Sequence, residues 1–337
     1  MQIMGNIDGK VDVAVFILAY NHEKWIQKSI DSILKQKVNF RIKVYIHDDC
    51  STDNTKKVIE EAYQIHPEII VPILQETNQF SKGSSIFNIV MPLLNCDFVA
   101  LCEGDDFWID ENKLQIQYNY MKSHKNCSYC FGNAMLVDIN NNPLRKFYSR
   151  YSWKDKTISK KIRSIPGAVF STEELIFLDF TPTATVMYRY DVWSILEQYK
   201  DQFDLALRLA STEIGECYYI NKVLSAYRVG NNASAHGTAA ASVDSYKKNY
   251  YERHKKVYLE FDKRTNRKYT EIINREIQRK LLQVYKQFMI IDVMRKQIAY
   301  NDLKTSVKLK CYLKKYIAPI FNFARNCRNI ISKIVHK

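Results

Sequence analysis

The sequence predicts an α/β fold in which a Rossmann-like, mostly parallel sheet is flanked by helices, with a helical extension at the C-terminal end. Two observations carry this prediction. Apolar runs at residues 11–20, 41–49 and 97–102 have the length and composition of buried strands. Each run is followed by a segment with apolar side chains at helical spacing, and this alternation indicates parallel βαβ units.

The first strand and its helix are expected within residues 11–34. The strand, VDVAVFILAY, is almost continuously apolar, as a parallel strand covered on both faces would be. Asn21 follows the strand and is expected to cap the helix. The apolar side chains of Ile26, Ile30 and Ile33 fall on one face of that helix.

The next strands are expected at residues 41–49 and 69–74, with an amphipathic helix between them. Pro72 has no backbone N–H to donate, so the strand that contains it is expected to be short or to lie at an edge of the sheet. A further helix is expected within residues 83–95, before the strand at 97–102.

Three acids, Glu103, Asp105 and Asp106, directly follow the strand at residues 97–102. Carboxylates this close raise each other's pKa unless a cation or strong hydrogen-bond donors lie among them. Oxygen ligands of this kind suit magnesium or manganese. The alternative is an acidic turn that caps a helix beginning near Asp110. Both interpretations stay open on these residues alone.

Side chains suited to nucleotide binding follow all three strands. Tyr20 ends the first strand, and Asp48 and Asp49 end the second. In parallel sheets ligands bind outside the carboxyl ends of the strands. An aromatic face can stack on a base, and a carboxylate can accept a hydrogen bond from a base or a ribose. Taken singly, Tyr20 could be a core residue and the two Asp residues a turn and helix cap, but their coincidence favours one binding crevice.

Three runs carry a resemblance to a known family. Residues 17–34 (ILAYNHEKWIQKSIDSIL), 46–55 (IHDDCSTDNT) and 102–117 (CEGDDFWIDENKLQIQ) resemble the successive motifs of the family 2 glycosyltransferases. The resemblance covers about residues 11–235. It implies the GT-A fold and a glycosyltransferase of the bacterial surface-polysaccharide type.

The resemblance also implies how the chain is divided. Residues 1–240 would form the GT-A catalytic domain, with the nucleotide-binding half at about 11–125 and the acceptor half at about 126–240. Residues 241–337 would form a basic, helical C-terminal region.

In the nucleotide-binding half, the resemblance gives each strand end a role. Tyr20 would stack on uracil or another base. Asp49, with Asp48 nearby, would contact the base and the ribose.

The acid cluster would bind the rest of the donor. The run Glu103-Gly104-Asp105 stands where the family often has Asp-x-Asp. Asp105, with Asp106, would therefore hold the Mn²⁺ or Mg²⁺ that bridges the diphosphate. Glu103 replaces the usual Asp, and its longer side chain is expected to reach the ribose or the water shell of the metal.

The acceptor half carries further landmarks. Residues 180–189 resemble the segment near which donor sugar and acceptor meet, which places Thr183 there. Asp204 precedes a leucine-rich helix, a glycine and an apolar strand that ends in Tyr-Arg. By that match Asp204 would be the general base and Arg228 a donor, acceptor or phosphate contact. The alternative is that Asp204 caps the helix. Gly230 stands where the family commonly has His.

These roles describe an inverting hexosyltransferase of class EC 2.4. It would move a sugar from a nucleoside-diphosphate sugar, with UDP as the expected nucleotide, to a glycan acceptor in lipopolysaccharide, O-antigen or capsule biosynthesis. The alternative is a non-catalytic nucleotide-sugar-binding protein of the same fold. A sugar nucleotidyltransferase is disfavoured because AYNHEKW, after the first strand, lacks the glycine of a phosphate loop.

The charge distribution separates the last quarter of the chain from the rest. The net charge is +14, but residues 246–337 hold 24 Lys and Arg against 7 Asp and Glu, a net of +17. The remainder is slightly acidic, so nucleic acid is not an expected partner. Residues 303–337 have no acid and carry an apolar stripe. This segment is expected to bind an anionic membrane surface, where the acceptor could be lipid-linked, or to pack on protein.

The eight cysteines are scattered and several fall within apolar runs. Cys127 and Cys130 form a lone CxxC without a second pair at zinc-ribbon spacing, so both are interpreted as core residues. Reduced thiols and the absence of a recognisable leader predict a cytoplasmic protein. The basic segment would place it peripherally on the inner face of the plasma membrane.

Overall fold

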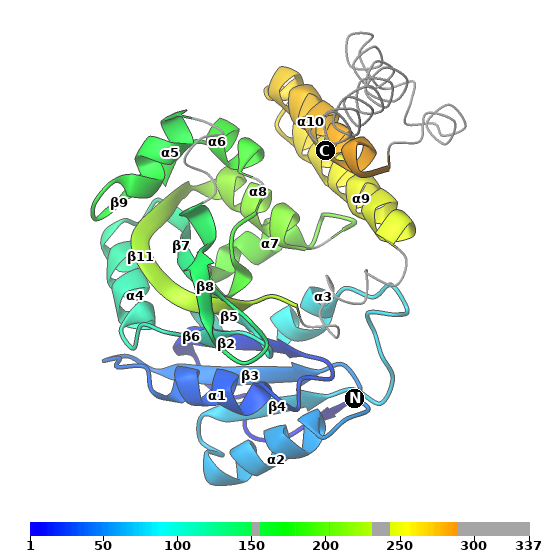
Figure 1. Ribbon diagram of the computed structural model, residues 1–337. Coiled ribbons are helices and arrows are strands. Elements are labelled where there is room, and N and C mark those ends of the chain that lie inside the picture. Colours follow the sequence, from blue (N-terminus) through cyan, green and yellow to red (C-terminus); the bar gives the residue numbers. More distant parts are fainter. Residues whose placement is uncertain (150–155, 179, 202, 231–242, 289–337) are drawn as a thin grey trace, which may run out of the picture. The chain divides into compact units, whose positions relative to one another are not determined.

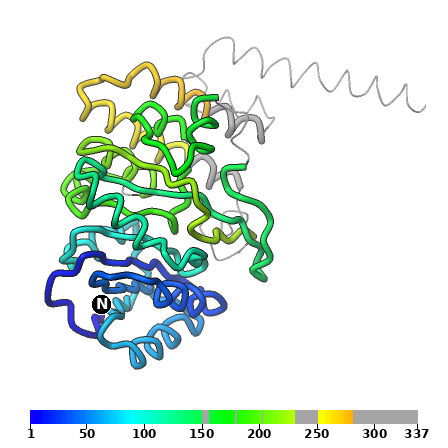
Figure 2. The backbone as a smooth tube through the Cα atoms, turned by 90° about the vertical axis from the view of Figure 1, so that its left-hand side faces the viewer, coloured from blue at the N-terminus to red at the C-terminus, as the bar shows by residue number. Residues whose placement is uncertain are grey.

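The computed structural model describes residues 1–149, 156–178, 180–201, 203–230 and 243–288. The chain divides into two compact units, Met1–Ala241 and Ser242–Lys337. Figures 1 and 2 show the elements of both units.

The first unit is built on one sheet of eleven strands, in the order β1-β4-β3-β2-β5-β10-β7-β11-β6, with β8 on β7 and β9 on β11. The strands are β1 (Gln2–Ile3), β2 (Val11–Ala19), β3 (Ile42–Asp48), β4 (Ile70–Leu74), β5 (Cys96–Glu103), β6 (Phe107–Trp108), β7 (Cys127–Val137), β8 (Pro143–Lys146), β9 (Gly167–Phe170), β10 (Met187–Arg189) and β11 (Glu216–Arg228).

The predicted parallel strands are confirmed in the N-terminal part of this sheet. β4, β3, β2 and β5 are parallel neighbours, because each buried apolar run is joined to the next through a helix. β4 has five residues, as Pro72 led us to expect, and only the two-residue β1 lies beyond it.

The rest of the sheet is mixed, which differs from the mostly parallel order that was expected. β10 is antiparallel to both β5 and β7, and β11 is parallel to β7 but antiparallel to β6 and β9. Figure 1 shows β11 curving alongside β7, and the register between them shifts at three places along β11.

The helices of the first unit follow the predicted alternation. Asn21 is not a helix cap, however, because α1 starts five residues later with Trp25 at its N-cap position. The helix expected within residues 83–95 is short and passes into a 3₁₀ turn at Met91. The helical segments are α1 (Ile26–Leu34), α2 (Thr55–Ile65), α3 (Ile86–Val90), η1 (Met91–Leu93), α4 (Lys113–Ser123), α5 (Lys156–Arg163), α6 (Thr172–Phe177), η3 (Thr183–Thr185), η4 (Tyr190–Val192), α7 (Trp193–Leu196) and α8 (Asp204–Ile214).

The core lies along the central strands. Val13, Val15 and Ile17 of β2 are fully buried and pack with Ile26, Ile30 and Ile33 of α1 and with residues of β3 and β5. Among the described residues the cysteines are free thiols, and all but Cys50 are buried. Cys127 and Cys130 are core residues, as predicted.

The second unit contains the helices α9 (Val243–Arg264) and α10 (Thr270–Phe288), which confirm the predicted helical C-terminal region. A short turn joins them, and Thr270 Oγ1 donates to Asp262 Oδ2 at 2.6 Å. Of the helices that the structure describes, none combines the length and apolar character needed to cross a bilayer. The amphipathic segment expected at residues 303–337 lies outside the described residues.

Candidate active site

The strand order creates one place where a ligand can enter between the carboxyl ends of the strands. β2 pairs in parallel with both β3 and β5, so the chain runs outward from β2 in both directions. Such a switch point leaves a crevice between the loops that follow the two central strands. Here the loops after β2 and β5 meet, and Gly104 N donates to Leu18 O at 2.7 Å.

The loops after β2 and β3 are bonded to each other. Asn21 N donates to Ser51 Oγ at 2.9 Å, and Thr52 N donates to Asn21 Oδ1 at 2.8 Å. Asn21 and Cys50 have φ values of 55° and 62°, a region that residues with a Cβ adopt at some cost. The bonds between the loops hold this conformation, so the loop ends form a fixed platform.

The two Asp residues at the end of β3 are also engaged by the chain itself. Asp48 accepts hydrogen bonds from the backbone N and the hydroxyl of Ser51, and burial raises the pKa of its carboxyl group. Asp49 Oδ1 accepts from Gln79 N at 2.7 Å, and Oδ2 accepts from Phe80 N at 3.0 Å. Tyr20 lies half-buried directly after β2. These residues therefore lie at one end of the sheet, where sequence reasoning expected them.

The acid cluster, defined as Glu103, Asp105 and Asp106, does not cap a helix. The helix that follows is α4, which begins at Lys113 with Asn112 at its N-cap position. Asp105 and Asp106 are buried, with exposed fractions of 8% and 2%. The capping interpretation of these acids is therefore wrong.

The charges of the acid cluster act on one another and on Asp204. Burial raises the pKa of Glu103 to about 8, and the charges of Asp105 and Asp204 add to this shift. Burial, Asp105 and Glu103 likewise raise the pKa of Asp106. Asp204 is the first residue of α8, whose N-cap position is Phe203. A carboxylate more than 90 residues further along the chain thus faces the end of β5.

Tyr227 lies near the four carboxylates Glu103, Asp105, Asp106 and Asp204. It lies next to the last residue of β11 and is half-buried. Burial raises the pKa of its hydroxyl group, and the charges of all four carboxylates raise it further. The charges of the acid cluster and of Asp204 thus act on the same hydroxyl group, which indicates that all four carboxylates lie near it.

Arg228 is hydrogen-bonded both to the acid cluster and to the loop that follows β7. Its backbone N donates to Asp106 Oδ1 at 2.8 Å, and its Nε donates to Asp105 O at 2.7 Å. The guanidinium group also donates to Asp138 O at 2.9 Å and to Asn141 Oδ1 at 2.8 Å. The side chain is buried and lies 5.2 Å from the Trp25 ring centre. Its partners in the structure are thus protein groups, whereas sequence reasoning expected a ligand contact.

His22 belongs to the site but was not selected from the sequence. Its Nε2 lies 4.0 Å from Asp105 Oδ1, and burial lowers the pKa of the ring. A Cβ atom on Gly104 would lie 2.7 Å from His22 Nδ1 and 3.0 Å from Ile26 Cδ1. The position of His22, two residues after Tyr20 in a strand-end loop, was the signal available in the sequence.

Thr183 begins the 3₁₀ turn η3 and is half-buried. This turn packs against β5, β6 and β11, the strands that carry Glu103 and Tyr227 and that border the cluster. The structure therefore brings the turn that contains Thr183 next to the strands that carry Glu103 and Tyr227.

The acid cluster fits a cation that is bound partly by a ligand. Among the described residues no group of three or more His, Cys, Asp or Glu side chains is arranged to hold a metal ion. Asp106 Oδ2 is buried and receives no hydrogen bond from the part of the chain that the structure describes. Magnesium commonly uses one or two carboxylates together with substrate phosphates. Asp105 and Asp106 fit that mode of binding.

Comparison with known proteins places these residues in a family context. Residues 14–175 match the family model described as Glycosyl transferase family 2. An uncharacterized protein of Mycobacterium bovis is 29% identical over 177 residues, which cover 52% of this chain and 46% of that protein. The UDP-Glc:alpha-D-GlcNAc-diphosphoundecaprenol beta-1,3-glucosyltransferase WfgD of Escherichia coli is 32% identical over 137 residues, which cover 40% of this chain and 50% of that protein. The matches span about half the length of these relatives.

Two solved structures are similar in fold. The crystal structure of S. aureus TarS 1-349 in complex with UDP-GlcNAc has a TM-score of 0.55 at 17% identity, over 82% of this chain and 80% of that one. The mannosyltransferase PcManGT from Pyrobaculum calidifontis, in complex with GDP-Man and Mn²⁺, has a TM-score of 0.52 at 10% identity, over 93% and 89% of the two chains. At these identities the likeness concerns the fold, and it confirms the predicted GT-A-like architecture.

Proposed function

This chain belongs to glycosyl transferase family 2, and from that premise we propose that it transfers a sugar from a nucleoside-diphosphate sugar to a glycan acceptor with inversion at the anomeric carbon. The observation that carries the proposal is the convergence of Asp204 and the acid cluster around Tyr227. A base and a diphosphate site on facing elements are what a single displacement requires.

The donor in this proposal is a UDP-sugar. Tyr20 stacks on the base, and Asp49, with Asp48 nearby, contacts the base and the ribose. The hydrogen bonds that hold these Asp residues support the proposal, since they fix the carboxylates before a nucleotide arrives. Two similar proteins support UDP as well, since WfgD is named as a transferase that uses UDP-Glc and TarS was crystallised in complex with UDP-GlcNAc.

Asp204 is the general base of the proposed reaction. It takes the proton from the acceptor hydroxyl while that oxygen attacks the anomeric carbon, and the nucleoside diphosphate leaves on the opposite side. Thr183 lies where donor sugar and acceptor meet. Arg228 positions the cluster through its bonds to Asp105 and Asp106.

Asp105 and Asp106 would hold a divalent cation, Mn²⁺ or Mg²⁺, and Glu103 would contact the ribose or the water around the ion. When bound, the cation stabilises the negative charge on the leaving diphosphate. The side chains of the site orient the donor and exclude water from it.

The acceptor in this proposal is a glycan of a bacterial surface polysaccharide, and it is lipid-linked. The name of WfgD supports this, since it specifies a diphosphoundecaprenol-linked acceptor. The excess of Lys and Arg after residue 245 supports a position on the cytoplasmic face of an anionic membrane.

The proposal is tested by calorimetric titration of UDP and of GDP into the protein, with and without Mn²⁺. We expect UDP to bind with the metal and to bind much more weakly without it. In Asp105→Ala, Mn²⁺ should no longer strengthen the binding of UDP, because the substitution removes a ligand of the metal. Asp191→Ala, at an exposed acid outside the site, is the matched control and should bind as the wild type does. A folded protein that binds neither nucleotide under any of these conditions would contradict the proposal.

A further inference from the structure

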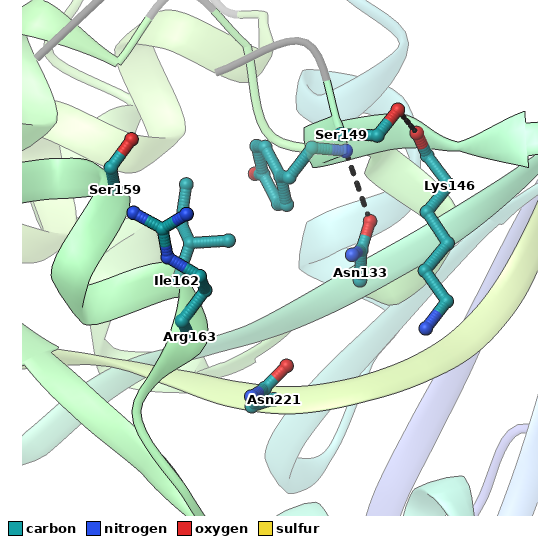
Figure 3. Close-up of a pocket in the computed structure, with 8 residues that line it drawn as sticks. Asn133, Lys146, Ser149, Ser159, Ile162, Arg163 and Asn221 are labelled. Atoms are coloured by element: carbon teal, nitrogen blue, oxygen red, sulfur yellow. Dashed lines mark hydrogen bonds between the residues drawn. The ribbon is translucent and has the colours of Figure 1, made fainter. Parts of the chain in front are cut away.

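A cavity of about 320 Å³ lies in the acceptor half of the first unit. Its volume is within the range of roughly 300–1,000 Å³ that is usual for small-molecule sites. Figure 3 shows Lys146 and Arg163 on opposite sides of the cavity, with Asn133 and Asn221 between them. Four elements, β8, α5, β7 and β11, therefore supply its polar groups.

The described side chains that line the cavity carry positive charge and no negative charge. Lys146 and Arg163 are its charged groups, and none of the described residues that line it is acidic. No ion pair to a carboxylate is found for either cation within the described part of the chain, and both side chains are exposed. A guanidinium group, an ammonium group and two amides match an anionic oxygen group that is attached to a hydroxylated ring.

Tyr148, which lines the cavity, is the neighbour in the chain of a residue that packs near Tyr227. Tyr148 N donates to Asn133 Oδ1 at 3.2 Å on the cavity side. The neighbouring Phe147 ring lies 5.9 Å from the Tyr227 ring centre, and the Phe180 ring lies 5.9 Å from it as well. The two half-buried Phe rings, next to Tyr227, are called the aromatic wall below.

The reaction centre and the cavity differ in the sign of the charges around them. The acid cluster and Asp204 disfavour any negative group at the reaction centre, except one bound through a cation. A negatively charged acceptor must therefore hold its charge elsewhere. The cavity, one residue away, is lined by the cations that would accept it.

We propose that this cavity is an acceptor subsite that binds an anionic group, a carboxylate or a phosphate, carried by the acceptor glycan. The inference rests on the proposed function and adds the class of acceptor. The acceptor crosses the aromatic wall, with its hydroxyl at Asp204 and its acidic substituent between Lys146 and Arg163.

The test measures the binding of glucuronic acid, glucose 6-phosphate and glucose by saturation-transfer NMR, with and without UDP. We expect the two anionic sugars to bind at least about tenfold more tightly than glucose, because contacts to charged groups are the strong ones. The carboxylate and phosphate arms show which anion the site prefers. UDP should not displace either sugar.

A matched pair of double variants makes the test specific. Lys146→Gln with Arg163→Gln should lose about tenfold or more in affinity for the anionic sugars. Arg145→Gln with Lys160→Gln removes the same charge from β8 and α5 at residues that do not line the cavity, and it should change little. Circular dichroism melting verifies that both variants fold.

The outcomes separate this inference from the proposed function. Equal binding of glucose, equal losses in both double variants, or displacement by UDP would each overturn the assignment of the cavity. UDP binding with no response to the anionic sugars overturns the cavity alone. Failure of UDP to bind, while the anionic sugars still depend on Lys146 and Arg163, overturns the proposed function and leaves the anion site in place.

Discussion

The carboxylates that follow β3 and those that follow β5 lie at the same end of one sheet but in different surroundings. Asp48 and Asp49 accept hydrogen bonds from Ser51, Gln79 and Phe80. In the acid cluster the charges of neighbouring carboxylates add to the effect of burial, and together they raise the pKa values of Glu103 and Asp106. The carboxylates of the first region have hydrogen-bond donors from the protein itself. Those of the second region are stabilised when a cation or a proton binds to them.

This difference indicates how the proposed work is divided. A region satisfied by its own donors keeps its shape and can recognise a flat base without rearrangement. A region of mutually repelling acids stores unfavourable interactions that a bound cation relieves. Three predictions test the comparison, beginning with the largest effect.

Asp204→Asn should lower the rate of sugar transfer by about 10²–10⁴-fold, the usual contribution of a general base. The amide cannot take the proton, but it keeps the size of the side chain at the start of α8. The affinity for UDP should stay close to that of the wild type, because in the proposed mechanism Asp204 acts on the acceptor and not on the nucleotide. Turnover with a panel of UDP-sugars and calorimetry with UDP measure the two quantities.

The matched control for that variant is Asp191→Asn, an exposed acid in η4, which should retain full activity. Transfer by Asp204→Asn at the wild-type rate would remove Asp204 from the mechanism. An equal loss of UDP affinity and rate would instead mean that Asp204 belongs to the nucleotide region.

Gly104→Ala should destabilise the protein by up to about 3 kcal/mol, the usual upper range for overpacking. The new methyl group would lie 2.7 Å from His22 Nδ1 and 3.2 Å from the carbonyl oxygen of Leu18. Gly104 lies where the loops after β2 and β5 touch, so the change strains the contact between these two loops. Urea denaturation of the wild type and the variant gives the difference in the free energy of unfolding.

A double-mutant cycle with His22→Ala identifies the source of that strain. Removal of the imidazole should relieve part of the clash, so the double variant should be more stable than the sum of the single effects predicts. Strict additivity would mean that the clash is with the Leu18 backbone, and that the His22 side chain does not couple the two regions.

Much of the fold was predictable because its signals are local. The runs that became β2, β3 and β5 are long and apolar, and each is followed by a helical period. The second half of the sheet was harder to predict. β10 has three residues and β6 has two, which is too short for any periodicity, and their pairings join distant parts of the chain.

The same contrast between local signals and long-range contacts applies to the candidate site. Tyr20, Asp49 and Asp105 could be selected because each directly follows a strand. His22 and Tyr227 could not, since their importance arises from packing against Gly104 and from four carboxylates contributed by two elements. The resemblance to a family selected Asp204, but the distance along the chain between Asp204 and Glu103 hid their proximity. The partners of Arg228 could not be predicted either, because they are backbone and side-chain atoms of loops that are distant along the chain.

The smallest expected effect concerns the region after β3 and appears as a change with pH. His47 is fully buried in β3 beside Gln75, and burial lowers its pKa to about 4. In the unfolded chain the ring titrates near 6.5. As the pH falls from 7 to 5 the unfolded state gains a proton that the folded state does not, so stability is lost on the acid side, by about 2 kcal/mol at pH 5. His47→Gln should therefore have a shallower acid limb in urea denaturation, even if it is less stable at pH 7.

His66→Gln, at a side chain that is 39% exposed, is the control and should keep the slope of the wild type. The acid cluster acts in the opposite direction, since acids with raised pKa values lose stability as the pH rises. If His47→Gln and the wild type have the same acid limb, His47 takes up its proton in the folded state. The strand that carries Asp48 would then be less closed to solvent than the burial of His47 indicates.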